Sequence, residues 1–218
     1  MFLETPIKRK SLQKMVYETV REAILEREIE PGDSINIKRL AEKLGVSNIP
    51  VREALRHLEA EGMVNFTSNK RILVSQLSCE DLYDIYSLRI PLEEMALLKC
   101  LERIDEKDLH RLESLHKQMS KNGVIGNKWF NLNRSFHMIL HESSGSSRLF
   151  QILQSLWNST GPYLRVFSES KSAVDRANLE HARILESLKK SDRSLAKKAI
   201  KAHLRNGLKV IESNLKEQ

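Results

Sequence analysis

Three residues, Gly45-Val46-Ser47, connect two segments that each have the apolar spacing of a helix. The first segment runs from Ile37 to Leu44, and the second ends near Ala60. Because the connection is so short, the two helices cannot continue along one axis and must cross sharply around a small core. The spacing therefore predicts a helix-turn-helix. The residues spaced to fill its angle are Leu40, Leu44, Val46, Val51, Leu55 and Leu58.

The segments on either side complete a small domain. Helical spacing over residues 12–24 predicts a helix before the pair. After Gly62, two short strand-like runs at residues 63–67 and 72–76 flank the polar turn Ser68-Asn69-Lys70-Arg71. This pattern predicts a two-stranded hairpin with cations at its tip. Residues 1–76 are therefore expected to form a winged helix-turn-helix domain.

The rest of the chain, residues 77–218, has helical periodicity and no useful strand-like alternation. Breaks near residues 105, 122–127, 143–147, 168–172 and 191–192 predict about six helices with short connections, an all-helical antiparallel bundle. The fold class is therefore mainly α. Two cysteines are too few for a disulfide framework, and no apolar run approaches the length of a membrane span. We expect a cytoplasmic protein with no membrane partner.

Residues 12–75 carry a specific resemblance. They include Pro31-Gly32, Leu40-Ala41, Leu44-Gly45-Val46-Ser47, the run PVREAL at 50–55 and the run LEAEG at 58–62. The segment resembles the GntR family of bacterial transcription regulators. This resemblance implies binding to double-stranded operator DNA as a homodimer. The formal net charge of +7 allows a polyanion partner, but the excess is spread over both halves and does not locate the DNA site.

Arg52 is the leading candidate for contacting a base. It lies one turn beyond Ser47 and Asn48, which belong to the start of the second helix, the end expected to face DNA. A guanidinium can bond both O6 and N7 of guanine; alternatively, Arg52 pairs with a phosphate or with Glu53.

The family resemblance adds Lys38, Asn69 and Lys70 to the DNA-contacting residues. Two positions depart from the family pattern. Asn48 stands where Arg is usual, and since Asn suits adenine, the operator sequence is expected to be unusual. Arg71 stands where the wing usually has Gly, which implies a different turn and a further phosphate contact.

Three histidines of the second region lie on apolar helical stripes. Asn133 and His137 share one stripe in residues 128–142, His181 lies on a second stripe, and His203 lies on a third in the last helix. Burying so many unpaired ring nitrogens is unfavourable, and one divalent metal such as zinc satisfies several at once. The alternative is an ordinary core of hydrogen-bonded histidines.

A second resemblance concerns these histidines. The FCD type of C-terminal domain, found behind GntR heads of the FadR subfamily, has an acidic residue four positions before a Phe-His pair, a later Glu-His pair and a histidine in its last helix. Phe136-His137, Glu180-His181 and His203 fit this pattern, which implies a metal site. Asn133 replaces the usual Asp, which implies weaker metal binding or water as the fourth ligand. The length of the region resembles the six-helix, VanR-like variety.

Arg89 lies inside the apolar stripe of Leu82, Ile85, Leu92 and Ala96. The family also has an Arg before a Leu-Glu pair, as here in the run RIPLE at 89–93. Three neutral histidine ligands would leave the charge of a metal open to anions, so our hypothesis is that Arg89 and the metal together bind a small organic acid. The alternatives are a pair with Glu93 at the rim of the bundle or a side chain that extends to solvent.

These features favour a ligand-responsive transcription regulator, and the family resemblance favours a repressor. A metal-dependent enzyme is the alternative, because three histidines and an open position also describe catalytic zinc. No H-E-x-x-H motif, activated nucleophile or glycine-rich phosphate loop supports it, so we expect no enzymatic activity. A further alternative is a DNA-binding dimer whose bundle binds no ligand.

Overall fold

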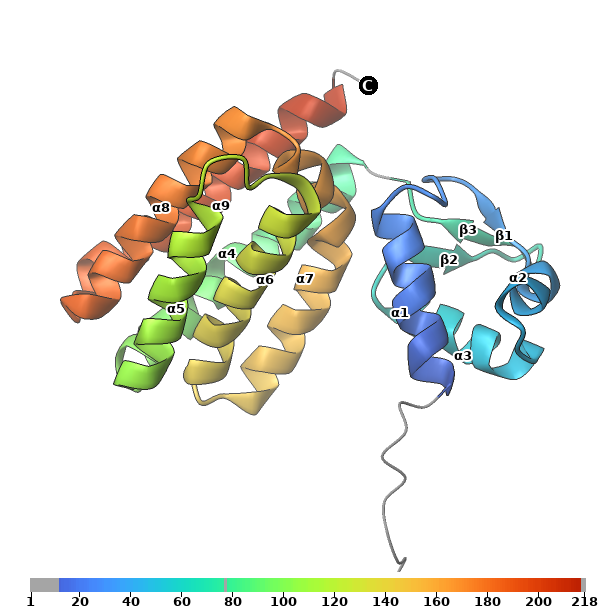
Figure 1. Cartoon of the computed structure of the whole chain (residues 1–218), viewed down its shortest axis with the longest axis horizontal. Helices are drawn as coiled ribbons and strands as arrows, with labels where there is room; N and C mark the ends of the chain where they lie inside the picture. Colours follow the sequence, from blue (N-terminus) through green and yellow to red (C-terminus); the bar gives the residue numbers. More distant parts are fainter. Residues whose placement is uncertain (1–11, 77, 217–218) are drawn as a thin grey trace, which may run out of the picture. The chain divides into compact units, whose positions relative to one another are not determined.

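The computed structural model describes residues 12–76 and 78–216, which divide into two compact units between Gln76 and Leu77 (Figure 1). The first unit contains α1 (Leu12–Leu25), β1 (Ser34–Ile35), α2 (Ile37–Leu44), α3 (Asn48–Ala60), β2 (Val64–Phe66) and β3 (Ile72–Val74). The second contains α4 (Cys79–Leu101), α5 (Glu106–Met119), α6 (Gly126–Ser143), α7 (Ser147–Ser168), α8 (Lys171–Lys189) and α9 (Arg193–Lys216). The predicted fold class is confirmed.

Local interactions produce the sharp connection between α2 and α3. The side chain of Asn36 accepts a hydrogen bond from the Arg39 amide at 3.1 Å and so caps the start of α2. Gly45 ends this helix at φ +66°, a conformation that costs other residues free energy. Ser47 holds the N-cap position of α3, but its side chain makes no capping bond. Its hydroxyl is therefore available for other contacts.

The wing has one strand more than the sequence predicts. β2 and β3 pair antiparallel, with Val64 opposite Val74, and β1 pairs with the other edge of β3. β1 has only two residues, too few to show an alternating pattern. At the tip, Lys70 adopts φ +59°, so the left-handed position of this turn belongs to Lys70 and not to Arg71.

One cation joins the second helix of the helix-turn-helix to the wing. The guanidinium of Arg56 lies over the Phe66 ring, 4.4 Å from its centroid, and bonds the Glu59 carboxylate at 3.0 Å. The other oxygen of Glu59 accepts the Phe66 amide hydrogen at 3.3 Å. The side chains of Arg56 and Glu59, both on α3, thus contact Phe66 of β2.

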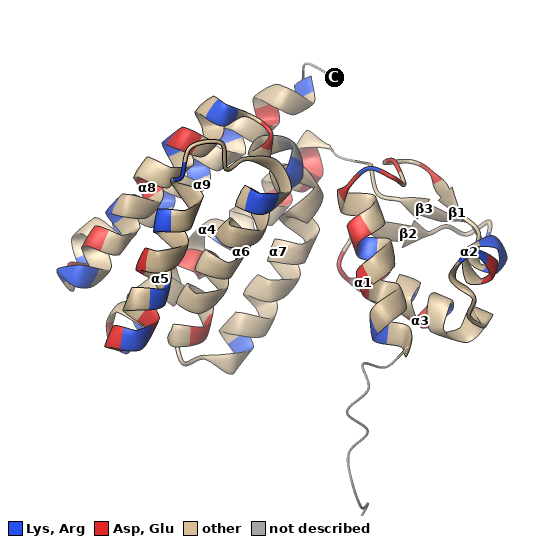
Figure 2. Ribbon diagram, in the orientation of Figure 1, with Lys and Arg blue, Asp and Glu red and all other residues tan. Residues whose placement is uncertain are grey.

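The second unit is an antiparallel bundle in which α4 packs against α6, α7 and α9 (Figure 1). Lys and Arg alternate with Asp and Glu on the outer faces of α5 and α8 (Figure 2). At the start of α4, the Tyr163 hydroxyl of α7 accepts the Ser78 amide hydrogen at 3.1 Å and donates to Asp81 at 2.7 Å. Among the described residues, no helix is both long enough and apolar enough to span a bilayer.

Candidate DNA-binding surface and buried histidine site

The seven residues predicted to contact DNA are all exposed in the first unit. Within the described part of the chain, the Arg52 side chain makes no hydrogen bond or ion pair, with Glu53 or any other residue. Its guanidinium is thus available to a partner. The seven positions lie at the start of α2, in the first turns of α3 and at the wing tip: Lys38, Ser47, Asn48, Arg52, Asn69, Lys70 and Arg71.

Sequence reasoning missed Ile49 on the same surface. It lies in the first turn of α3, three residues before Arg52, and 74% of its surface is exposed. Residues three apart on a helix are neighbours, so an apolar side chain and a guanidinium lie side by side here. The signal in the sequence was that Ile49 is apolar although it lies outside the buried stripe of α3.

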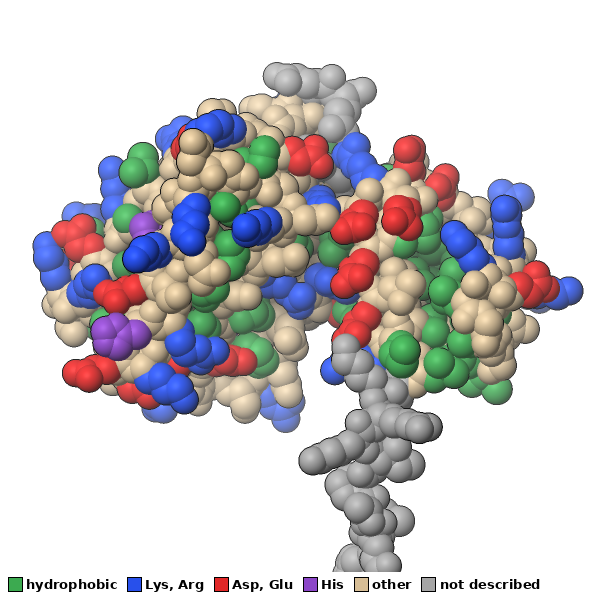
Figure 3. Space-filling model, viewed as in Figure 1, with side chains coloured by type: hydrophobic (Ala, Val, Ile, Leu, Met, Phe, Trp, Pro, Cys, Tyr) green, Lys and Arg blue, Asp and Glu red, His purple; other side chains and the backbone are tan. Residues whose placement is uncertain are grey.

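Charge divides the first unit into two kinds of surface. Acidic residues outnumber cations along α1 and the loop after it, whereas Lys38, Arg39 and Lys43 outnumber Glu42 on α2 (Figure 2). The space-filling view shows Asp and Glu side chains gathered over α1 (Figure 3). An excess of acidic residues disfavours a phosphate backbone, so the α1 surface is less suited to DNA than α2 and the cationic tip of the wing.

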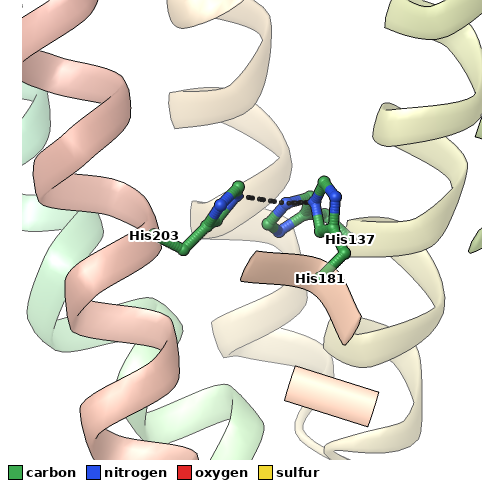
Figure 4. A group of neighbouring side chains, drawn as sticks. All are labelled: His137, His181 and His203. Carbon is green, nitrogen blue, oxygen red and sulfur yellow. Dashed lines mark hydrogen bonds between the residues drawn. The ribbon is translucent and has the colours of Figure 1, made fainter. Parts of the chain in front are cut away.

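In the second unit, the three predicted histidines meet at the centre of the bundle. His137 comes from α6, His181 from α8 and His203 from α9, and their rings converge (Figure 4). The Nε2 atom of His137 is 3.4 Å from Nε2 of His181 and 3.3 Å from Nε2 of His203. All three are buried, with 1%, 0% and 8% of their surfaces exposed. We call them the histidine cluster.

The Glu93 carboxylate on α4 lies beside this cluster and accepts five hydrogen bonds. Its Oε1 accepts from Arg89 Nη2 at 2.6 Å, Arg89 Nε at 3.2 Å and Trp157 Nε1 at 3.0 Å. Its Oε2 lies 3.1 Å from His137 Nδ1 and 3.1 Å from His141 Nε2. Glu93 thus connects the predicted effector residue Arg89 with the predicted metal ligand His137.

These contacts determine charge states. Burial alone would raise the pKa of Glu93, but the charge of Arg89 and hydrogen bonding by His137 hold it well below its usual range. Burial lowers the pKa of His137 to about 4, although Glu93 opposes this effect. Burial, with His203 and His137 close by, also lowers the pKa of His181 well below its ordinary value. At neutral pH the site therefore combines an ionised carboxylate with neutral His137 and His181 rings.

A second carboxylate supports the opposite side of the cluster. Glu180 on α8 places Oε2 3.0 Å from Nδ1 of His203, and its Oε1 accepts from Asn206 at 2.7 Å. Burial would raise the pKa of Glu180, but the hydrogen bonds from His203 and Asn206, with the charge of Arg176 nearby, together outweigh it and lower the pKa. His203 thus donates its Nδ1 proton to an ionised acceptor.

A small cavity adjoins the cluster. Its volume is about 20 Å³, and Arg89, Asn133, His137 and His203 contribute to its lining together with Trp157 and other aromatic side chains. Arg89 Nη1 and Asn133 Oδ1 are buried and have no hydrogen-bond partner among the described residues. A donor and an acceptor without partners among the described residues therefore belong to side chains that line the same small cavity.

Two family models match the chain. The model described as "Bacterial regulatory proteins, gntR family" matches residues 12–74, and the FCD domain model matches residues 84–206. The HTH-type regulator YdhC of Bacillus subtilis is 30% identical over 205 residues, which cover 92% of this chain and 91% of YdhC. The chain belongs to the GntR family, with an FCD domain.

Other GntR relatives agree with this assignment. Escherichia coli McbR is 28% identical over 160 residues, 72% of each chain, and the E. coli repressor GlaR is 21% identical over 207 residues, 90% of this chain and 94% of GlaR. The solved structure of E. coli McbR has the same fold, with a TM-score of 0.81, 23% identity and coverage of 95% of this chain and 100% of that chain. The protein is a DNA-binding transcription regulator and not an enzyme.

The donor set of this FCD domain fits a divalent metal. Two rings direct Nε2 lone pairs toward the same point, because their Nδ1 protons are bonded to Glu93 and Glu180. Imidazole nitrogens suit zinc and similar transition metals, and the buried Asn133 oxygen is a further donor close by. A bound metal would supply a positive charge that attracts anions.

Sequence reasoning missed the residues that orient the cluster. It treated Glu93 only as a rim partner of Arg89, whereas both side chains are just 1% exposed. The available signal was the four-residue step from Arg89, which places Glu93 on the same buried face of α4. Glu180 precedes His181 directly, and only the structure shows that it bonds His203 on another helix.

Proposed function

We propose that this GntR regulator represses transcription by binding a palindromic operator as a homodimer, and that its bundle binds a divalent metal and a small carboxylate effector. The DNA contacts are assigned to the seven exposed residues of α2, α3 and the wing. The observation that carries this assignment is the exposed and unpaired Arg52 on α3. Repression agrees with the name of the relative GlaR.

The side chains of α3 suggest which bases are recognised. Arg52 can bond guanine, Asn48 suits adenine, and the exposed Ile49 suits the methyl group of thymine. Lys38, Lys70 and Arg71 are placed for phosphates, which give affinity and salt dependence without sequence preference.

Exposed apolar residues support a homodimer through the bundle. Leu88 and Met95 lie two turns apart on α4 and are 55% and 49% exposed, and Ile152 on the adjacent α7 is 50% exposed. Exposed apolar side chains on one face of a helix, as at Leu88 and Met95, are typical of a protein interface. Sedimentation should give the mass of two chains, and a monomer at micromolar concentration would contradict this.

The small cavity constrains the effector. About 20 Å³ holds little more than one water molecule, so an organic acid needs neighbouring side chains to move. Arg89 already donates two hydrogen bonds to Glu93, which leaves Nη1 for a ligand. The small volume and the pairing of Arg89 with Glu93 also favour a second candidate, a DNA-binding dimer whose bundle binds no effector.

We expect Arg52→Ala to lose about 10- to 100-fold in discrimination between operator and unrelated DNA. A bidentate contact to guanine is worth about 1–3 kcal/mol. Binding to a duplex from the protein's own promoter and to a scrambled duplex should be measured at several salt concentrations. Arg52→Lys keeps the charge but loses the planar guanidinium that bonds both guanine acceptors. It should therefore retain salt-sensitive DNA binding without specificity for the operator. Equal operator affinity of wild type and Arg52→Ala would refute the assignment.

We expect the purified protein to contain about one equivalent of zinc or a similar metal per chain. His181→Ala should reduce the metal content to near zero, since it removes one of three ligands. His110→Ala is a matched control, because His110 is exposed and bonded to Glu113 outside the cluster. Metal should be measured by elemental analysis before and after treatment with a chelator. Wild-type protein that cannot be loaded with zinc, cobalt or nickel would support the dimer without a ligand.

We expect Arg89→Ala to weaken binding of a small carboxylate by at least tenfold. A panel of mono-, di- and hydroxycarboxylic acids should first be screened by thermal shift on metal-loaded protein, and the strongest hit titrated calorimetrically. Arg89→Lys keeps a positive charge beside Glu93 and serves as the control for folding. Effector affinity that is unchanged in both folded variants would exclude Arg89 from the site.

A further inference from the structure

Two small cavities adjoin each other beside the histidine cluster. The inner cavity is the one of about 20 Å³ that Arg89 and Asn133 help to line. An outer cavity of about 10 Å³ is lined in part by Glu180 and by Arg176, which lie 3.5 Å apart. The Arg176 side chain is 63% exposed, so the outer cavity lies at the surface of the bundle. Three residues line both cavities and separate them: Phe167, His203 and Gly207.

Gly207 is an unexpected residue at its position. It lies well inside α9, where glycine is less favourable than any residue except proline. The packing of the helix does not require it. Among the described residues, a Cβ placed there would meet only the Tyr86 hydroxyl within 4 Å, at 3.6 Å, which is an ordinary van der Waals distance. Alanine would therefore fit and favour the helix, so the absence of a side chain between the two cavities needs another explanation.

The Phe167 ring borders the same place from α7. It lies one residue before the end of α7, and 5% of its surface is exposed. Its ring centroid is 5.7 Å from that of Trp129. His203, the third separating residue, is held in place by its bond to Glu180 at 3.0 Å. Rotation of the Phe167 side chain to another rotamer is thus the smallest movement that would join the two cavities.

We propose that small ligands enter the inner cavity between Phe167 and Gly207. Phe167 is the movable side of this passage, and Gly207 keeps it wide enough to use. The passage leads from the surface beside Arg176 to Arg89 Nη1 and Asn133 Oδ1, the buried donor and acceptor that have no partner among the described residues. That the ligands are a metal ion and a small carboxylate rests on the proposed function, whereas the passage itself does not.

The passage acts on the rates of binding and selects ligands by size. A side chain at position 207 would narrow the route without removing any of the histidines that are proposed to bind the metal. Entry and exit of a metal ion should therefore slow by the same factor, and its affinity should stay the same. A change in affinity would instead indicate a structural effect on the site.

The tryptophans of the protein provide a test that needs no bound ligand. Trp129 and Trp157 are the two tryptophans of the chain, both line the inner cavity, and they are 1% and 2% exposed. The rate constant for quenching of their fluorescence lifetimes by acrylamide measures how readily a small neutral molecule reaches this cavity. We expect Gly207→Leu to lower this constant at least threefold, and Phe167→Ala to raise it at least threefold.

Ala202→Leu is the matched control, because it places a leucine at an exposed position of the same helix. It should leave the quenching constant unchanged. Gly207→Ala should lower the constant about twofold and raise the melting temperature, because alanine favours the helix. Wild-type quenching in folded Gly207→Leu and Gly207→Ala would overturn the proposal. Should Gly207→Leu fail to fold, Gly207→Ala still decides, since its Cβ fits the space.

Metal kinetics distinguish failure of the passage from failure of the metal site. Cobalt uptake and its removal by a chelator should be followed by visible absorption, and both rates should fall by the same factor in Gly207→Leu. Reduced quenching in Gly207→Leu, together with a wild-type protein that binds no cobalt, would support the passage and contradict the metal site. Cobalt binding at wild-type rates in Gly207→Leu would overturn the passage as the route of the metal.

Discussion

Burial of one carboxylate organises the bundle. Glu93 lies on α4, the helix that packs against three others, and removing its charge from water costs several kcal/mol unless hydrogen bonds replace the lost hydration. Arg89, Trp157, His137 and His141 provide five such bonds from α4, α6 and α7. Each donor is thereby fixed in direction, and a polar network of this kind specifies how the helices pack.

The sequence was sufficient wherever a local rule decides the structure. The Gly45-Val46-Ser47 connection predicts the crossing of α2 and α3, because a short linker and a left-handed cap act within a few residues. Helical periodicity likewise predicts that His137, His181 and His203 are buried, and the structure brings all three together. An apolar stripe shows which side of a helix faces the core. Three core-facing histidines in one small bundle are therefore expected to lie close together.

What could not be predicted depends on contacts between distant segments. The bond between Glu180 and His203 joins two helices, and nothing in the local sequence of either specifies it. The third strand, β1, forms because β3 offers a free edge, and two residues carry no periodic signal. The sequence correctly predicts that Arg89 lies on the inner face of its helix. How deeply Arg89 is buried depends on how α4 packs against its neighbours.

The link between α3 and the wing has a mechanical consequence. Arg56 lies on the Phe66 ring and Glu59 bonds the Phe66 amide, so contacts from α3 restrain the position of the hairpin. A restrained span favours duplexes whose groove width matches it, and other duplexes would have to deform to fit. Sequences differ in the energy of that deformation, so operators would be sorted partly by flexibility at base pairs that no side chain touches.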